Sequence, residues 1–158
     1  MPGSPRERWP ARALWRTLLP DAAEATSFDP RVMGLPSIAK DLTVSLQEDR
    51  PGMLARAAEA IASGGLNLEG FAEIAGTLHL LASDPRSARL ALEAVGLRVV
   101  GEREVVVAPV EDRPGAVALV FGLLAETGIN VSYTYVASRN RIVLAVDETE
   151  KAIAALRR

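Results

Sequence analysis

The 158-residue sequence contains no cysteine and a single histidine, His79. Without cysteine there is no disulfide framework, no thiol catalysis and no Cys-based zinc or iron–sulfur site. One histidine cannot supply a multi-His metal site or most His-dependent catalytic triads. We therefore expect neither a metal nor a cofactor.

The sequence also lacks a long apolar run and an excess of charge of one sign. Its longest apolar stretch, residues 116–125, is too short to span a bilayer. A net charge of -2 and a pI near 5.5 give no general attraction to nucleic acid or to an anionic membrane. With 49% hydrophobic residues the chain can form a core, and with no evident targeting segment we expect it in the cytoplasm.

Residues 1–39 differ from the rest, because six of the ten prolines lie there and interrupt any helix of useful length. Two interpretations remain open for this segment. It is either a poorly ordered tail or a short helix, bearing Trp9 and Trp15, that docks on the folded body or on a partner.

The remainder of the chain is a repeat. Asp49-Arg50-Pro51-Gly52 recurs as Asp112-Arg113-Pro114-Gly115, 63 residues later. Gly65-Leu66-Asn67-Leu68 recurs as Gly128-Ile129-Asn130-Val131 at the same offset. Matches in one ungapped register indicate two copies of one structural unit.

Each copy shows the same order of expected elements. In the first, alternating apolar residues predict a strand over 41–47, and Asp49, as a possible cap, and Pro51 mark the start of a helix. Strands over 66–75 and 77–83 and a helix from Asp84 to about residue 96 follow. The strand over 97–101 is then joined to the next unit by a polar connector at 102–104. The order β-α-β-β-α-β is the ferredoxin-like arrangement, in which two helices cover one face of an antiparallel sheet.

We therefore expect an α+β protein with a tail over 1–39, a first unit over 40–102 and a second over 103–158. The chain ends after the second helix of the second unit, which consequently lacks its last strand. The tail, the first unit or another chain could fill that place. Units of about 60 residues are marginal alone, which favours pairing of the units and a homodimer.

The strand, the Asp-Arg-Pro-Gly helix start and the Gly-Leu-Asn-Leu segment resemble the ACT domain, and two copies resemble the stand-alone tandem ACT proteins. The resemblance implies a non-enzymatic, allosteric regulator that binds an amino acid where two ACT units meet. An alternative is a regulatory subunit of an amino-acid biosynthetic enzyme such as acetolactate synthase. An enzyme on this scaffold is disfavoured, because no nucleophile–base pair or metal cluster is visible.

The expected site follows from the chemistry of an amino acid. Its carboxylate needs N–H donors, which a helix start supplies, and its ammonium needs an acceptor such as Asp or Asn. The resemblance adds a polar residue two places before the Asp and an Asn from the other unit. The better predicted site comprises Gln47, Asp49, Gly52, Met53, Leu54 and Asn130, and the weaker one comprises Asp112, Gly115, Ala116, Val117 and Asn67.

The second site is predicted to be weaker because Val110 stands where the first copy has Gln47. A purely structural interpretation also remains, since Asp-Arg-Pro-Gly is good chemistry for ending a strand and starting a helix. We expect His79 to be structural and the alternating Tyr133 and Tyr135 to pack rather than bind.

Overall fold

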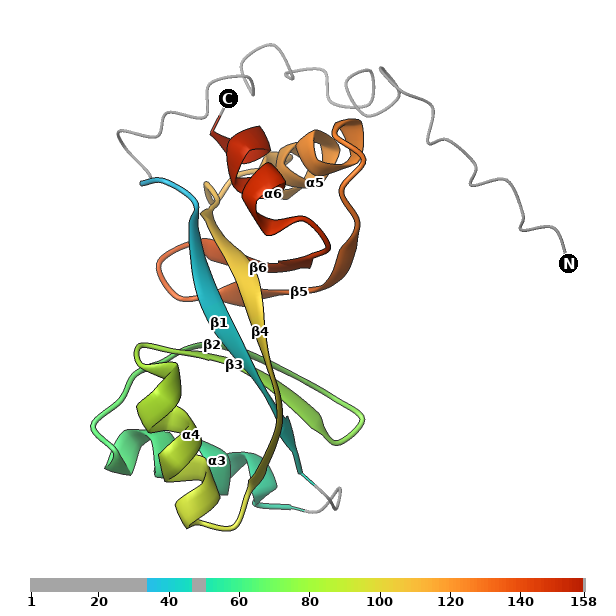
Figure 1. Ribbon diagram of the computed structural model, residues 1–158. Coiled ribbons are helices and arrows are strands. Elements are labelled where there is room, and N and C mark those ends of the chain that lie inside the picture. Colours follow the sequence, from blue (N-terminus) through green and yellow to red (C-terminus); the bar gives the residue numbers. More distant parts are fainter. Residues whose placement is uncertain (1–33, 47–50, 158) are drawn as a thin grey trace, which may run out of the picture.

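A computed structural model describes residues 34–46 and 51–157 and shows an α+β protein with an antiparallel sheet (Figure 1). This confirms the expected α+β class with an antiparallel sheet. The elements in chain order are β1 (Ser37–Ser45), α3 (Met53–Ser63), β2 (Leu68–Ile74), β3 (Thr77–Ala82), α4 (Pro85–Ala94), β4 (Arg98–Pro109), α5 (Ala116–Glu126), β5 (Val131–Ala137), β6 (Arg141–Val146) and α6 (Thr149–Leu156).

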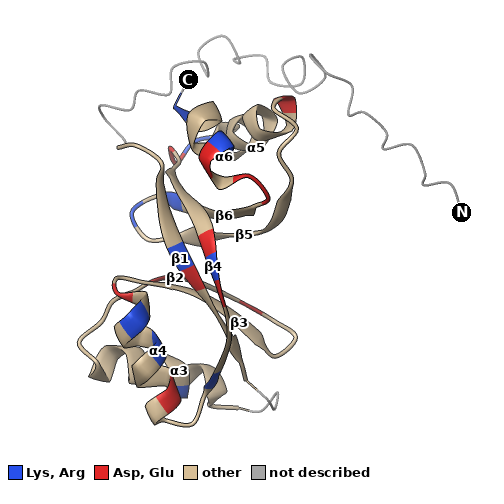
Figure 2. Ribbon diagram, viewed as in Figure 1, with Lys and Arg blue, Asp and Glu red and all other residues tan. Residues whose placement is uncertain are grey.

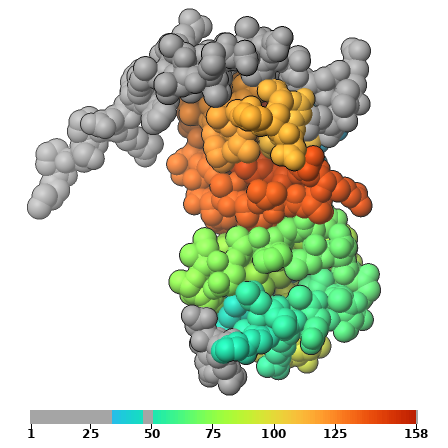
Figure 3. Space-filling model, turned by 180° about the vertical axis from the view of Figure 1, so that it is seen from behind, coloured from blue at the N-terminus to red at the C-terminus, as the bar shows by residue number. Residues whose placement is uncertain are grey.

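The molecule has helices at its two ends and strands between them (Figure 1). The first half of the molecule holds β2, β3, α3 and α4, whose helices pack around a core that includes Leu42, Leu80 and Leu92. The second half holds β5, β6, α5 and α6, whose helices cover a separate core. Strands β1 and β4 run through both halves. A third apolar cluster, which includes Val105 and Val143, lies between the halves. Figure 3 shows the green first half and the orange second half stacked on one another.

Strand β1 pairs with β4 along its whole length, from Ser37 opposite Val107 to Ser45 opposite Arg98. Its first residues, 37–40, therefore lie beside the part of β4 that belongs to the second half. This is the edge at which a missing strand was expected. In the described structure β1 pairs there with β4 and satisfies the backbone groups that would otherwise be exposed.

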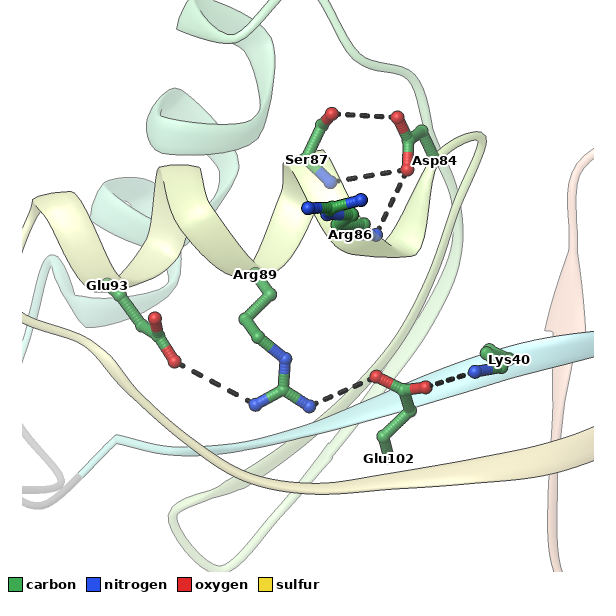
Figure 4. Close-up of polar contacts among 7 residues, drawn as sticks. All are labelled: Lys40, Asp84, Arg86, Ser87, Arg89, Glu93 and Glu102. Atoms are coloured by element: carbon green, nitrogen blue, oxygen red, sulfur yellow. Dashed lines mark hydrogen bonds and ion pairs between the residues drawn. The ribbon is translucent and has the colours of Figure 1, made fainter.

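Strand β4 runs without a break through residues 102–104, where a polar connector was predicted. Charged residues of both signs lie in the middle of β1 and β4 (Figure 2). Glu102 lies 2.5 Å from Lys40 on β1 and 3.1 Å from Arg89 on α4 (Figure 4). The hydrogen bond from Lys40 is the main reason that the pKa of Glu102 is lowered. Glu102 of the predicted connector thus forms ion pairs with β1 and α4 while the strand that carries it continues unbroken.

The strands form one closed barrel in the order β1-β3-β2-β5-β6-β4, where two separate sheets were expected. Strands β2 and β5 close it at a single pair, Gly70 opposite Ala137. A Cβ atom added at Gly70 would lie only 2.8 Å from the Cβ atom of Ala137, so the close approach needs glycine. The residue 63 positions after Gly70 is Tyr133, which is too bulky to allow the equivalent contact.

We predict that Gly70→Val destabilises the protein by about 1–3 kcal/mol, because the added side chain forces β2 away from β5. The free energy of unfolding, measured by urea denaturation, checks this. Gly64→Ala is the control, because Gly64 has φ -75° and its nearest neighbour would lie 3.4 Å from the new Cβ. An equal effect of both substitutions would contradict the role assigned to Gly70.

Candidate functional site

Helices α3 and α5 begin in the same unusual way. Their N-cap residues, Gly52 and Gly115, have φ values of 95° and 86°, in the left-handed region that glycine adopts most readily. Asp49, predicted as a cap, is not the N-cap residue. Helix α4 differs, because the Asp84 carboxylate accepts hydrogen bonds from the N–H groups of Arg86 and Ser87 (Figure 4). The N-cap residues of α3 and α5 are glycines and supply no such side-chain cap.

The better predicted site is only partly described by the structure. Gln47 and Asp49 lie outside the described residues. Gly52, Met53 and Leu54 form the start of α3. Leu46, in the described part of the chain that precedes this site, is held at the β2–β3 turn, because its N–H donates to the carbonyl of Gly76 at 2.9 Å.

Asn130, the remaining member of that predicted site, lies between α5 and β5 in the second half. Its N–H donates to the Asp147 carboxylate at 3.1 Å, and its carbonyl accepts from the Asp147 N–H at 3.3 Å. These described contacts tie Asn130 to the end of β6 and not to the start of α3.

The weaker predicted site lies wholly within the described residues. The Val110 N–H donates to the Asn140 carbonyl at 2.7 Å, which fixes the start of the second loop against the β5–β6 turn. The Ser138 N–H of that turn donates to the Glu69 carbonyl at 2.6 Å. Glu69 also pairs with Arg141 at 2.9 Å. Asn67 itself is tied to the end of β3, because the Ser83 N–H donates to its carbonyl at 3.2 Å. Its described contacts, like those of Asn130, do not include the loop that holds Asp112 and Gly115.

The second loop is, however, partly closed by its own groups. Arg113 pairs with Glu111, and the Ala116 N–H donates to the Arg113 carbonyl at 3.3 Å. A cavity beside this loop measures only about 30 Å³, which is room for a water molecule and not for an amino acid. The N–H group of Ala116, one of the predicted donors to a ligand carboxylate, therefore already has a partner within the protein.

A buried polar cluster inside the barrel was missed at the level of sequence. Its centre is Asp41 on β1, which is completely buried. The Tyr135 hydroxyl donates to one carboxylate oxygen at 2.6 Å and the Tyr133 hydroxyl to the other at 2.9 Å. The His79 Nδ1 lies 3.0 Å from the latter oxygen. The cluster therefore joins β1 and β3 of the first half to β5 of the second.

Neighbouring contacts hold Tyr133 in place. Its ring lies against that of His79, with 4.1 Å between centroids, and the Arg103 guanidinium lies 5.7 Å from its centroid. Burial, followed by the charge of Asp41, raises the pKa of both Tyr133 and Tyr135 above the usual value. Both hydroxyls are therefore protonated donors at neutral pH, which suits them to compensate a buried carboxylate.

The alternation in β1 explains why this cluster was hidden in the sequence. Leu42 and Val44 face the helices, so Asp41 faces the opposite side of the sheet. In an open sheet that side would face solvent, where an aspartate is ordinary and does not indicate a buried cluster. Closure of the barrel places Asp41 inside. The alternation of Tyr133 and Tyr135 on one face of β5 was the available clue.

We predict that Tyr135→Phe lowers the free energy of unfolding by about 1–3 kcal/mol, because it leaves a buried carboxylate oxygen without its donor. Urea denaturation at pH 7 measures this. In a protein that already carries Asp41→Asn, Tyr135→Phe should lower the free energy of unfolding by less, because the buried negative charge is no longer present. Equal costs in the two backgrounds would contradict the proposed pairing.

The same tyrosines predict how stability depends on pH. Their pKa values are raised in the folded state, so the unfolded chain releases these protons first, from about pH 10 upward. Their contribution is therefore fully present below pH 10 and is lost as the pH rises further. Between pH 9 and 11 we expect a smaller loss of stability in the Tyr133→Phe, Tyr135→Phe double variant than in the wild type.

The described residues contain no group of three or more His, Asp or Glu side chains that could hold a metal ion. Within that same part of the chain, no helix has the length and apolar character needed to cross a membrane.

No family model matches this chain, and no curated protein matches it. Among solved structures, protein BT0572 from Bacteroides thetaiotaomicron is 32% identical, with a TM-score of 0.66. The alignment covers 77% of this chain and 88% of BT0572.

The regulatory subunit of aspartate kinase from Thermus thermophilus, in its ligand-free form, is 22% identical with a TM-score of 0.53, over 79% of this chain and 93% of that one. The corresponding subunit from Thermus flavus is 19% identical with a TM-score of 0.52, over 79% and 96%. These two show a shared fold. Because its identity with BT0572 extends over most of both chains, this protein belongs to the same family as BT0572, and its fold is of the ACT type.

Proposed function

We propose that this protein is a non-enzymatic regulator that binds an amino acid through two tandem ferredoxin-like ACT units. The main support is the pair of helix starts at Gly52 and Gly115. Each has a glycine as its N-cap residue, which has no side chain to occupy the first N–H groups, and each follows the same Asp-Arg-Pro sequence. A helix start with available N–H groups binds a carboxylate, and an adjacent aspartate binds an ammonium.

The two helix starts differ in a way that favours the first. At the second, the Ala116 N–H is engaged by Arg113, and the adjoining cavity holds about 30 Å³. The first copy has Gln47 where the second has Val110, which gives it an additional polar group. We therefore propose that Gln47, Asp49 and the start of α3 form the better site. Asn130 completes it where two ACT units meet, within one chain or between two chains of a homodimer.

We predict that Asp49→Ala abolishes or strongly weakens amino-acid binding, whereas the matched substitution Asp112→Ala has a smaller effect. Loss of a charged hydrogen bond to the ligand ammonium should weaken binding about tenfold or more. A thermal-shift screen with the twenty amino acids identifies the ligand, and calorimetry then measures its affinity for both variants. Equal losses would contradict the asymmetry, and no binding by the wild type would contradict the function.

A second candidate is a regulatory subunit that acts on a separate biosynthetic enzyme, such as aspartate kinase or acetolactate synthase. The fold likeness to the T. thermophilus regulatory subunit supports it, because that likeness covers 93% of the subunit's chain. The two candidates differ in one measurement. A subunit changes the activity of its enzyme, or that enzyme's sensitivity to an amino acid, when the two purified proteins are mixed.

A further inference from the structure

An apolar cavity of about 270 Å³ lies in the first half, between α3 and strands β2 and β3. The side chains that line it are all apolar, among them Leu54, Ala57, Ala58 and Ile61 on α3 and Phe71 on β2. A cavity of about 150 Å³ lined by such residues is large enough for benzene. The space therefore suits the side chain of a large apolar amino acid.

The duplication shows why this space exists. Ala57 and Ala58 correspond to Val120 and Phe121, 63 residues later on α5. Val120 is buried in the second core, and Phe121 packs against that core. The same arrangement of helix and strands is thus filled by two larger side chains in the second half and left open in the first. The two small residues on α3 thus leave space in the first half that larger residues occupy in the second.

The position of the cavity connects it to the proposed amino-acid site. It begins at Leu54, in the first turn of α3, where the proposed carboxylate donors lie. Leu54 and Phe71 at its border are 45% and 54% exposed, so the space is accessible from solvent. Figure 3 shows the teal helix α3 beside the green segments of the first half on this face.

We propose that this cavity holds the side chain of the amino-acid ligand, and that the ligand is a large apolar amino acid such as leucine or phenylalanine. The inference rests on the proposed function and specifies its ligand. A charged or amide side chain would lose its hydration in the cavity without gaining a polar partner, because the lining offers none. A glycine or alanine ligand would leave most of the space empty.

The test is Ala58→Phe, which copies Phe121 of the second half into the first. Ala58 is exposed on α3, so the helix can accommodate the larger side chain without disrupting the core. We expect the wild type to bind leucine or phenylalanine about 10- to 100-fold more tightly than alanine, in calorimetry with each amino acid. In Ala58→Phe this ratio should fall to about one.

Ala62→Phe is the matched control, because Ala62 is exposed on the same helix but does not line the cavity. It should keep the wild-type ratio. Ala58→Leu provides a second, smaller filling substitution, and thermal unfolding shows that each variant is folded.

The outcomes separate this inference from the function on which it rests. If a polar amino acid binds best, or if Ala58→Phe keeps the apolar preference, the cavity proposal is overturned while the regulatory function stands. If Ala58→Phe instead weakens self-association in sedimentation and leaves the ratio unchanged, the cavity is an interface with a second copy, and the proposal is again overturned. Binding of no amino acid by the wild type overturns both.

Discussion

The antiparallel ladder between β1 and β4 is the constraint on which the rest of the structure depends. It extends from Ser37 opposite Val107 to Ser45 opposite Arg98 and so runs through both halves. Each half uses part of both strands, which means that neither can complete its sheet without the other. Hydrogen bonding of the backbone therefore makes one structure from two copies that would each be marginal alone.

The duplication is not symmetric in its side chains, and each departure has a physical consequence. Asp41, buried among tyrosines, faces the barrel interior from β1, whereas the apolar Val105 faces the same interior from the part of β4 that belongs to the second half. Tyr133 and Tyr135 correspond to Gly70 and Ala72, whose small size leaves the interior free for the two rings. The barrel interior is thus filled mainly from the second half. Such pairs of large and small residues specify how two related units pack without changing either fold.

Local features of the fold could be predicted from the sequence, because they depend on neighbouring residues. The alternation of Leu42 and Val44 indicated β1, and Asp84-Pro85 indicated the start of α4, as observed. Barrel closure could not be predicted, since it depends on contact between Gly70 and Ala137, which are remote in sequence. In the candidate site, the starts of α3 and α5 could likewise be predicted from the local sequence. The residues of the other unit that face these helix starts could not, because their positions depend on how the two units pack.

A regulator needs a physical connection between the place where a ligand binds and the rest of the molecule. Strand β1 offers one, because it leads toward the loop before α3 at one end and pairs with the second half at the other. Asp41, near its middle, is bonded to two tyrosines of β5. Displacing β1 would separate a buried carboxylate from its donors, at a large cost in free energy. Strand β1 and its contacts are therefore coupled, which is what transmission between two sites would require in the proposed function.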